Sequence, residues 1–76
     1  MLVSLDKFKP GDKGTVQKVT GEGAVRRRLF DLGITPGAFI IHRKTAPLGD
    51  PIEINVRGYQ LSLRKSEAES VLIEKE

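Results

Sequence analysis

Residues 24–37 constrain the fold of this chain more than any other stretch. They read Ala-Val-Arg-Arg-Arg-Leu-Phe-Asp-Leu-Gly-Ile-Thr-Pro-Gly. Val25, Leu29 and Leu32 recur at the spacing that places three aliphatic side chains on one stripe of a helix. The pattern predicts one short helix over about 24–32, with its apolar stripe packed on the core.

Signals for the end of this helix follow at once. Gly33 suits the left-handed conformation that closes a helix, and Ile34 stands where a Schellman cap makes its apolar contact. Pro36 and Gly37 suit the central positions of a type II turn, because Pro fixes φ at the first and Gly accepts positive φ at the second. The sequence therefore predicts a single helix of useful length, capped and turned back into the chain.

Much of the remaining chain has the composition and alternation of β-strands. Ile52, Ile54 and Val56 alternate with polar residues, as in a strand with one buried face and one wet face. Gly58 marks a tight hairpin turn into the next alternating segment. The strands predicted on these grounds cover about 14–20, 38–45, 52–57, 59–64 and 71–73.

Two single helical turns are expected beside the main helix. Ser4–Phe8 is short and amphipathic, with Leu5 and Phe8 facing inward. Ser66 and Glu69 have the spacing of a capping box, which predicts a single turn before the last strand. The chain is therefore expected to be mainly β.

The length of 76 residues is too short for two packed sheets of ordinary size. About five short strands can hide most of their edges by curling into one small barrel. The short helix would plug an open end of that barrel. We expect an SH3-like barrel that forms a single domain over residues 1–76, with an OB-like barrel as the alternative.

Composition favours a cytoplasmic protein. The chain has no Cys, so it can form neither disulfides nor thiolate metal sites. No apolar run approaches the length that crosses a bilayer, and the first residues lack the pattern of a signal peptide. The net charge is +3, and the basic excess is concentrated in residues 24–33. Such a patch can steer an acidic partner, but it is a weak indication of nucleic-acid binding.

No catalytic arrangement is evident, and we expect a protein that is not an enzyme. The segment Gly21-Glu22-Gly23 precedes the helix but lacks the Lys and the spacing of a phosphate-binding loop. A nucleophile and base pair would need His, and His42 is the sole one. His42 is interpreted as a side chain of the barrel wall.

Metal binding is the alternative chemistry. His42, Asp50 and Glu53 could converge across a hairpin, because residues on facing strands lie close together. Carboxylates at loop tips and on wet strand faces are usually solvated, however. We therefore predict no metal site and no cofactor, with a transition-metal ion as the alternative.

Five residues are candidates for binding a partner protein. Arg26 and Arg27 are either a solvated helix surface, with Arg27 paired to Asp31 one turn on, or an anchor for an acidic partner. Phe30 lies off the apolar stripe, so it either packs with Phe8 or is an exposed aromatic that a partner covers.

The other two candidates, Pro47 and Leu48, lie in a loop bracketed by prolines. That loop is either a rigid hairpin connection or a pre-ordered protrusion with Leu48 at its tip.

Three motifs resemble the ferrous-iron transport protein A (FeoA) family in order and spacing. They are Lys9-Pro10-Gly11-Asp12, Arg28-Leu29-x-Asp31-Leu32-Gly33-Ile34-x-Pro36-Gly37 and Ala46-Pro47-Leu48-Gly49-Asp50-Pro51. The likeness runs from Leu5 to about Ile73. The chain also resembles the C-terminal SH3-like domain of iron-dependent repressors.

The resemblance implies a small cytoplasmic SH3-like barrel that assists the membrane ferrous-iron permease. The expected partner is the cytosolic GTPase part of that permease, whose assembly or nucleotide turnover the chain would influence. Contact with the membrane is expected only through the partner, and self-association is possible. The resemblance carries no settled set of contact residues.

Three other functions are the alternatives. A nucleic-acid-binding barrel would need a stacking platform, whereas the chain has three Phe and one Tyr. An iron-responsive regulatory domain would bind metal through His42 and nearby carboxylates. A polyproline-binding module would need a Trp and Tyr cluster that this sequence lacks.

Overall fold

The computed structural model describes all 76 residues. In chain order the elements are β1 (Leu2–Ser4), the 3-10 helix η1 (Leu5–Lys7), β2 (Lys13–Val19), α1 (Gly23–Asp31), β3 (Phe39–Thr45), β4 (Ile52–Val56), β5 (Tyr59–Leu63), α2 (Lys65–Ala68) and β6 (Val71–Lys75). The mainly β fold, the short helix and the single turn before the last strand are confirmed.

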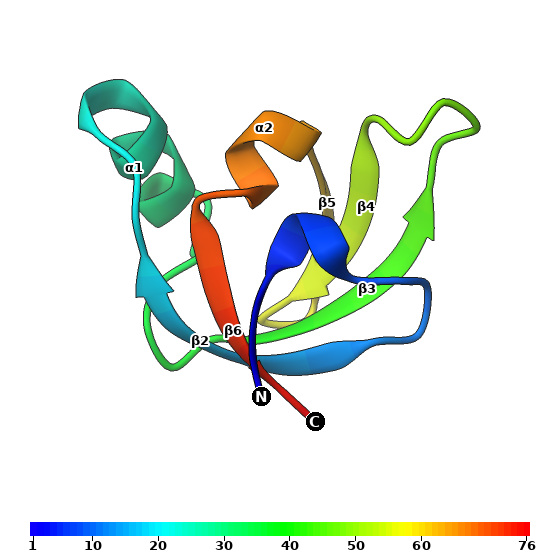
Figure 1. Ribbon diagram of the computed structural model, residues 1–76. Coiled ribbons are helices and arrows are strands. Elements are labelled where there is room, and N and C mark those ends of the chain that lie inside the picture. Colours follow the sequence, from blue (N-terminus) through cyan, green and yellow to red (C-terminus); the bar gives the residue numbers. More distant parts are fainter.

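The strands form one antiparallel sheet in the order β1-β6-β2-β3-β4-β5 (Figure 1). The sheet has six strands instead of the predicted five or so, because β1 adds to the edge of β6, with Val3 opposite Ile73. β1 is only three residues long, too short for a recognisable alternation. Its partner β6 lies at the other end of the chain, so no local sequence pattern predicts β1.

The core lies on the concave side of the curled sheet. In β4 the side chains of Ile52, Ile54 and Val56 are buried as the alternation predicts. The hairpin from β4 to β5 turns at Arg57 and Gly58, both with positive φ, as a tight two-residue turn requires. Fifteen buried hydrophobic residues form a single cluster.

Gly14 allows two strands to approach closely. A Cβ added there would lie 2.7 Å from Ile73 Cγ2 and 2.9 Å from Lys75 Cα, which is closer than real Cβ atoms come. β2 and β6 pair antiparallel at this point. The absence of a side chain at residue 14 is therefore needed for the β2–β6 pairing itself.

The end of α1 forms as predicted. The Gly33 amide donates to the Phe30 carbonyl at 3.0 Å and the Ile34 amide donates to the Leu29 carbonyl at 3.0 Å, which is the Schellman pattern. Gly33 has φ +89°, and Ile34 is buried. The type II turn follows, with the Ala38 amide donating to the Thr35 carbonyl at 3.0 Å.

The apolar stripe of α1 was predicted with one error. Leu29 is fully buried and Leu32 packs against the core, but Val25 is 39% exposed. Val25 lies in the first turn of the helix, where its side chain faces the loop at Gly21 instead of the core. The helix is anchored through its second half, because its first turn extends past the residues that make the core.

The open side of the barrel is closed by three elements, of which α1 was predicted to plug an open end. η1 contributes Leu5 and α2 contributes Ala68, both fully buried, and the two elements pack together in front of the sheet (Figure 1). α1 stands at one end of this opening and adds Leu29. The phenyl ring of Phe8, expected to face inward with Leu5, is also buried.

The N-cap of α2 is Arg64, two residues before the predicted Ser66, and the predicted capping box between Ser66 and Glu69 does not form. The Glu67 carboxylate accepts the Arg64 amide at 2.9 Å, and the Asp50 carboxylate accepts the Lys65 amide at 2.9 Å. Ser66 is inside the helix. The tertiary partner Asp50 supplies a cap that the local sequence does not encode, and this fixes the start of the turn at Lys65.

Candidate protein-binding surface

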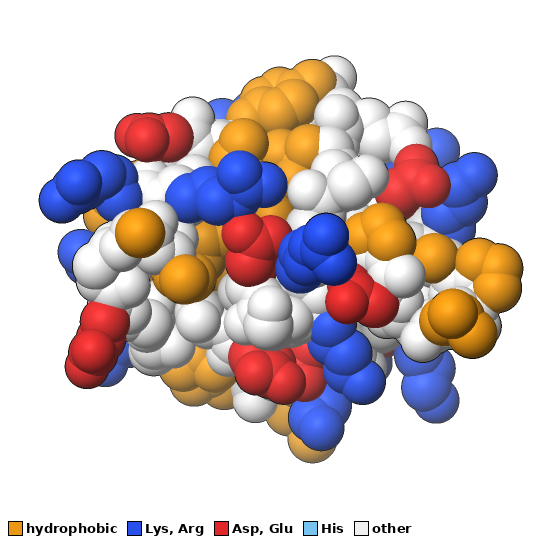
Figure 2. Space-filling view, turned by 90° about the horizontal axis from the view of Figure 1, so that it is seen from above, with side chains coloured by type: hydrophobic (Ala, Val, Ile, Leu, Met, Phe, Trp, Pro, Cys, Tyr) orange, Lys and Arg blue, Asp and Glu red, His pale blue; other side chains and the backbone are white.

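The predicted contact residues lie in two separate places, on α1 and on the β3–β4 loop, and both elements border the upper face of the molecule (Figure 1). In Figure 2 this face is seen from above, with α1 on the left, α2 in the centre and the β3–β4 loop at the right-hand tip. Arg26, Arg27 and Phe30 lie together on α1. Pro47 and Leu48 lie on the loop, on the far side of the mixed charges around α2. Three of the five candidate contact residues, those on α1, therefore lie close together in the structure.

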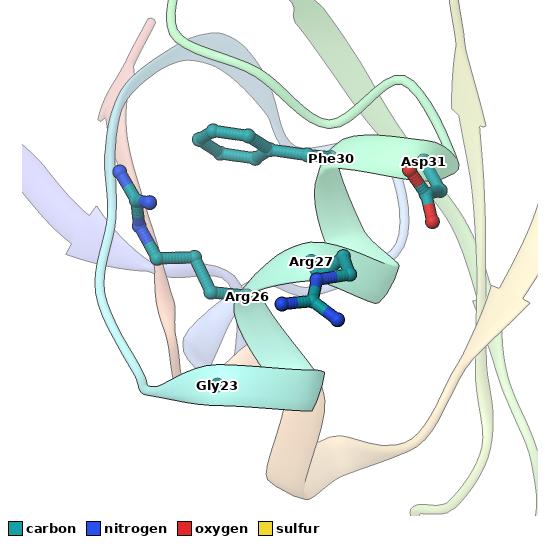
Figure 3. Close-up of a pocket in the computed structure, with 5 residues that line it drawn as sticks. All are labelled: Gly23, Arg26, Arg27, Phe30 and Asp31. Atoms are coloured by element: carbon teal, nitrogen blue, oxygen red, sulfur yellow. The ribbon is translucent and has the colours of Figure 1, made fainter.

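A shallow pocket of about 470 Å³ lies on the outer side of α1 (Figure 3). It is lined by residues of this helix alone: Gly23, Arg26, Arg27, Phe30 and Asp31. The two guanidinium groups lie toward the amino end of the helix, and Asp31 lies at the carboxyl end. We define these five residues as the α1 pocket. The sequence had indicated its basic and aromatic members but not that they share a cavity.

Arg26 is held in place by two contacts. Its Nε donates to the Val19 carbonyl at 3.3 Å, and its guanidinium lies 4.6 Å from the centroid of the Phe30 ring. A cation over an aromatic face is attracted by the ring quadrupole. Phe30 is half-buried and packs against the core cluster, so it is both a core-edge residue and the floor for Arg26.

Arg27 makes no hydrogen bond or ion pair within the chain, and the predicted pairing with Asp31 is not formed. The neighbouring Arg28 instead pairs with Glu67, Nε to Oε2, at 2.7 Å. The Glu67 carboxylate is well positioned for this ion pair, because its side chain is only 14% exposed and its other oxygen accepts the Arg64 amide. This ion pair joins α1 to α2, and only the tertiary structure could have revealed it.

The β3–β4 loop is a well-defined protrusion. The Ala46 amide donates to the Pro51 carbonyl at 3.0 Å, and the Gly49 amide donates to the Ala46 carbonyl at 2.7 Å. These bonds close the loop at its base and across its turn. Leu48 is 95% exposed at the tip, and Pro47 beside it is exposed as well. Leu48 lies at the tip of a protruding loop, as the second of the two sequence-based descriptions has it, and its contact with a partner stays a prediction.

A second pocket, of about 230 Å³, was missed by the sequence analysis. It lies between α1, α2 and β5, beside the start of β4. Its lining residues are Arg28, Pro51, Ser62, Leu63, Arg64 and Glu67. Because the lining comes from four separate segments, no local motif could have indicated it.

The three residues considered for a metal site are not brought together. His42 is 1% exposed, with Nε2 at 3.2 Å from the Thr45 hydroxyl and Nδ1 without a partner. The Glu53 carboxylate pairs with the Lys44 ammonium at 3.8 Å and accepts a hydrogen bond from the Gln60 amide nitrogen at 2.6 Å. The Asp50 carboxylate accepts the Lys65 amide at the start of α2. No group of three or more His, Cys, Asp or Glu side chains is placed to hold a metal ion.

Two residues of the β4–β5 hairpin fix the end of α1 against the sheet. Arg57 donates from Nε to the Gly33 carbonyl at 3.1 Å and from a terminal nitrogen to the Thr35 hydroxyl at 2.7 Å. The Tyr59 hydroxyl donates to the Leu32 carbonyl. Sequence reasoning missed this connection, since its members are more than 20 residues apart. It holds the α1 pocket at a fixed position over the barrel.

None of the helices combines the length and apolar character needed to cross a membrane.

Comparison with known proteins identifies relatives over nearly the whole chain. The family model of the FeoA domain matches residues 3–75. A protein of Porphyromonas gingivalis (strain ATCC BAA-308 / W83), described as an Fe(2+) transport protein A/Fe(2+) transporter FeoB fusion protein, is 31% identical over 70 residues, which are 92% of this chain. The chain spans only 8% of the length of that relative.

Solved structures agree in fold. A crystal structure of an iron uptake regulatory protein (FeoA) superposes with a TM-score of 0.92 at 37% identity, covering 100% of both chains. The FeoA of Stenotrophomonas maltophilia, solved as a complex with zinc and described as a prokaryotic SH3 domain protein, gives a TM-score of 0.84 at 26% identity and covers 97% of this chain and 95% of its own. The predicted SH3-like fold is confirmed.

The expected likeness to metal-dependent repressors is confirmed at the level of fold. A manganese-dependent transcriptional repressor in complex with manganese superposes with a TM-score of 0.91 at 17% identity, over 99% of this chain and 37% of that one. At this identity the likeness concerns the fold alone.

Proposed function

This chain belongs to the FeoA family, and on that premise we propose that it is a cytoplasmic accessory protein of ferrous-iron uptake. In this proposal residues 1–76 act as one SH3-like domain that binds the membrane ferrous-iron permease, FeoB, and modulates it. The domain itself catalyses no reaction, and it meets the membrane only through its partner.

The observation that carries this proposal is the fusion of the two proteins in a relative. In Porphyromonas gingivalis a domain 31% identical to this chain is part of one protein with the transporter FeoB. A covalent link raises the effective concentration of one domain at the other. We propose that the domain also contacts the permease through residues of its own surface.

The surface offers two kinds of contact, at the β3–β4 loop and at the α1 pocket. Leu48 is almost fully exposed on a loop that is already ordered, so a partner could cover it with little loss of conformational entropy. The α1 pocket adds two arginines beside a half-buried phenylalanine, and Arg is enriched at protein interfaces. We propose that Arg26, Arg27, Phe30, Pro47 and Leu48 contact the permease.

The part of the permease that we propose as the binding site is its cytosolic GTPase portion. Contact there could alter nucleotide turnover as well as assembly. The sign of the effect on GTP hydrolysis is therefore a result to be measured, with nucleotide present and absent.

Binding to the permease from the same organism, purified in detergent, tests the proposal. We expect the native chain to bind with a Kd in the micromolar range that is typical of transient complexes. Leu48→Asp should weaken binding because it places a charge in an apolar contact, and its exposed position should leave the melting temperature unchanged. The absence of binding at tens of micromolar would overturn the proposed function.

Self-association is a second outcome that Leu48 could support, because an exposed apolar tip can also bind a copy of the same chain. Sedimentation of the native chain and of Leu48→Asp over the same concentration range separates the two cases. A dimer that disappears in the variant indicates self-association. A monomer in both excludes self-association through Leu48, and a loss of permease binding in Leu48→Asp then assigns this residue to the permease.

A further inference from the structure

We propose that the α1 pocket binds an acidic segment of the permease, with a carboxylate of that segment held between Arg26 and Arg27. This inference rests on the proposed function and adds to it the chemistry of one contact. It follows from the charges, the geometry and the polarity of the pocket.

The charges of the pocket are not neutralised within the chain. Of the three arginines of α1, only Arg28 has a carboxylate partner, and that partner is Glu67. Arg26 uses Nε for a backbone carbonyl, which leaves its terminal nitrogens without a carboxylate, and Arg27 has no partner. The first turn of α1 contains no acidic residue, and the N-cap residue Glu22, the acidic side chain next to it in the chain, makes no capping hydrogen bond.

The two guanidinium groups line one pocket but lie apart in Figure 3, so the Arg27 side chain has to turn toward Arg26 for both to hold one carboxylate. Arg26 is already positioned by Val19 and by the Phe30 ring, so little side-chain entropy remains to be lost when it binds. Arg27 is free to adjust to the second oxygen. Guanidinium groups bind carboxylates through paired N–H donors, which gives geometric selectivity as well as affinity.

The two ends of the pocket also differ in charge. Phe30 provides an apolar surface and Asp31 a negative charge, both at the carboxyl end of the helix but on opposite sides of it (Figure 3). An acidic residue is thus favoured at the Gly23 end and disfavoured beside Asp31. The segment that fits has a carboxylate followed by an apolar side chain, with no second acidic residue at the Asp31 end.

Charge reversal with a matched control tests this assignment against the whole permease. Arg27→Glu should weaken binding by at least about tenfold, because an attractive contact becomes a repulsive one. Arg43→Glu makes the same change at an exposed arginine of β3 that has no ion pair, and it should change the Kd by less than about twofold. Since neither arginine has a partner in the chain, both variants should fold like the native protein, as circular dichroism and melting temperature would show.

Salt dependence separates the two parts of the contact. The Kd of the native chain should rise with ionic strength, and Arg27→Glu should remove most of that dependence because the attraction it abolishes is screened by salt. Phe30→Ala should raise the Kd while leaving the salt dependence intact, because the ring contributes apolar area.

The outcomes distinguish this inference from the proposed function. If the native chain does not bind the permease, the proposed function fails and the inference fails with it. If the native chain binds and Arg27→Glu binds equally well, the inference alone is overturned. Binding of a single-stranded or duplex DNA oligonucleotide that is lost in Arg27→Glu would also overturn it, by assigning the pocket to phosphate.

Discussion

Gly33 is the residue on which the attachment of α1 to the barrel depends. Its φ of +89° lets the chain reverse at the end of the helix. An added Cβ would lie 2.9 Å from the Tyr59 hydroxyl, the group that donates to the Leu32 carbonyl. Two independent requirements, a left-handed backbone and a close side chain, therefore coincide at one position.

A double-mutant cycle separates these two requirements. Gly33→Ala should destabilise the protein by more than about 2 kcal/mol, the sum of the left-handed backbone cost of roughly 1–2 kcal/mol and the contact with Tyr59. In a Tyr59→Phe background, which removes the hydroxyl, the same substitution should cost only the backbone part. Urea denaturation gives both values, and equal losses in the two backgrounds would show that the hydroxyl contact has no effect.

Asp12 should make stability depend on pH in the acid range. The Lys9 amide donates to the Asp12 carboxylate at 2.9 Å and the Lys75 ammonium lies 3.2 Å away; mainly through the Lys9 bond, these contacts hold the pKa of Asp12 below its ordinary value of 3.8. Because the folded state favours the charged form, this stabilisation is present above about pH 4 and is lost as the pH falls through the lowered pKa.

Asp12→Asn tests this dependence, since the amide oxygen can still accept the Lys9 bond but cannot titrate. Between pH 7 and pH 3 the urea midpoint of the native chain should fall further than that of the variant. The difference between the two curves isolates Asp12 from the other carboxylates. Parallel curves over this range would contradict the assignment.

At the scale of elements, α1 is held by its second half. Leu29 is fully buried, whereas Val25 is 39% exposed. The second half of the helix and its cap are also bonded to neighbouring elements. Arg28 pairs with Glu67 of α2, and the carbonyls of Leu32 and Gly33 accept hydrogen bonds from the β4–β5 hairpin. The first turn, which carries Gly23 and Arg26 of the α1 pocket, therefore remains accessible without weakening the attachment.

Two truncations of the same stripe should differ sharply in effect. Leu29→Ala should destabilise the protein by about 2–5 kcal/mol because it opens a cavity in the core. Val25→Ala should cost about 1 kcal/mol or less, since its side chain is partly exposed. Chemical denaturation of both variants gives the comparison, and similar losses would mean that the first turn packs on the core after all.

At the scale of the whole molecule, the curled sheet is a scaffold that presents one face. α1, α2 and the β3–β4 loop all lie on the same side of it, and both termini lie at the opposite end (Figure 1). The second pocket lies among α1, α2 and the end of β5, and Leu48 is exposed at the tip of the β3–β4 loop. A partner bound there would leave both ends of the chain accessible.

The potential metal ligands of the molecule are dispersed, so we expect no binding of ferrous ion. His42, Asp50 and Glu53 serve separate local contacts, and no group of three ligands is formed. Excess ferrous ion, added without oxygen, should leave the melting temperature unchanged, because a ligand that binds the folded state must stabilise it. A saturable rise that a chelator reverses would reveal a site and contradict this prediction.

The sequence alone determined those features that depend on neighbouring residues. The Schellman cap at Gly33, the turn at Pro36 and Gly37 and the hairpin at Gly58 were predicted correctly, because each is set by the φ preferences of one or two residues. The alternation of β4 likewise gave its buried face. Basic and aromatic residues on α1 identified the region of the candidate site.

Tertiary structure decided the features whose partners are distant along the chain. β1 forms because the edge of β6 is available for pairing, and Gly14 is needed because the β6 backbone lies against it. Arg28 pairs with Glu67 of α2, whereas the predicted pair of Arg27 and Asp31 does not form. The α1 pocket has its present position because the hairpin fixes the end of the helix. Such contacts depend on how the sheet curls, and no local pattern records that curvature.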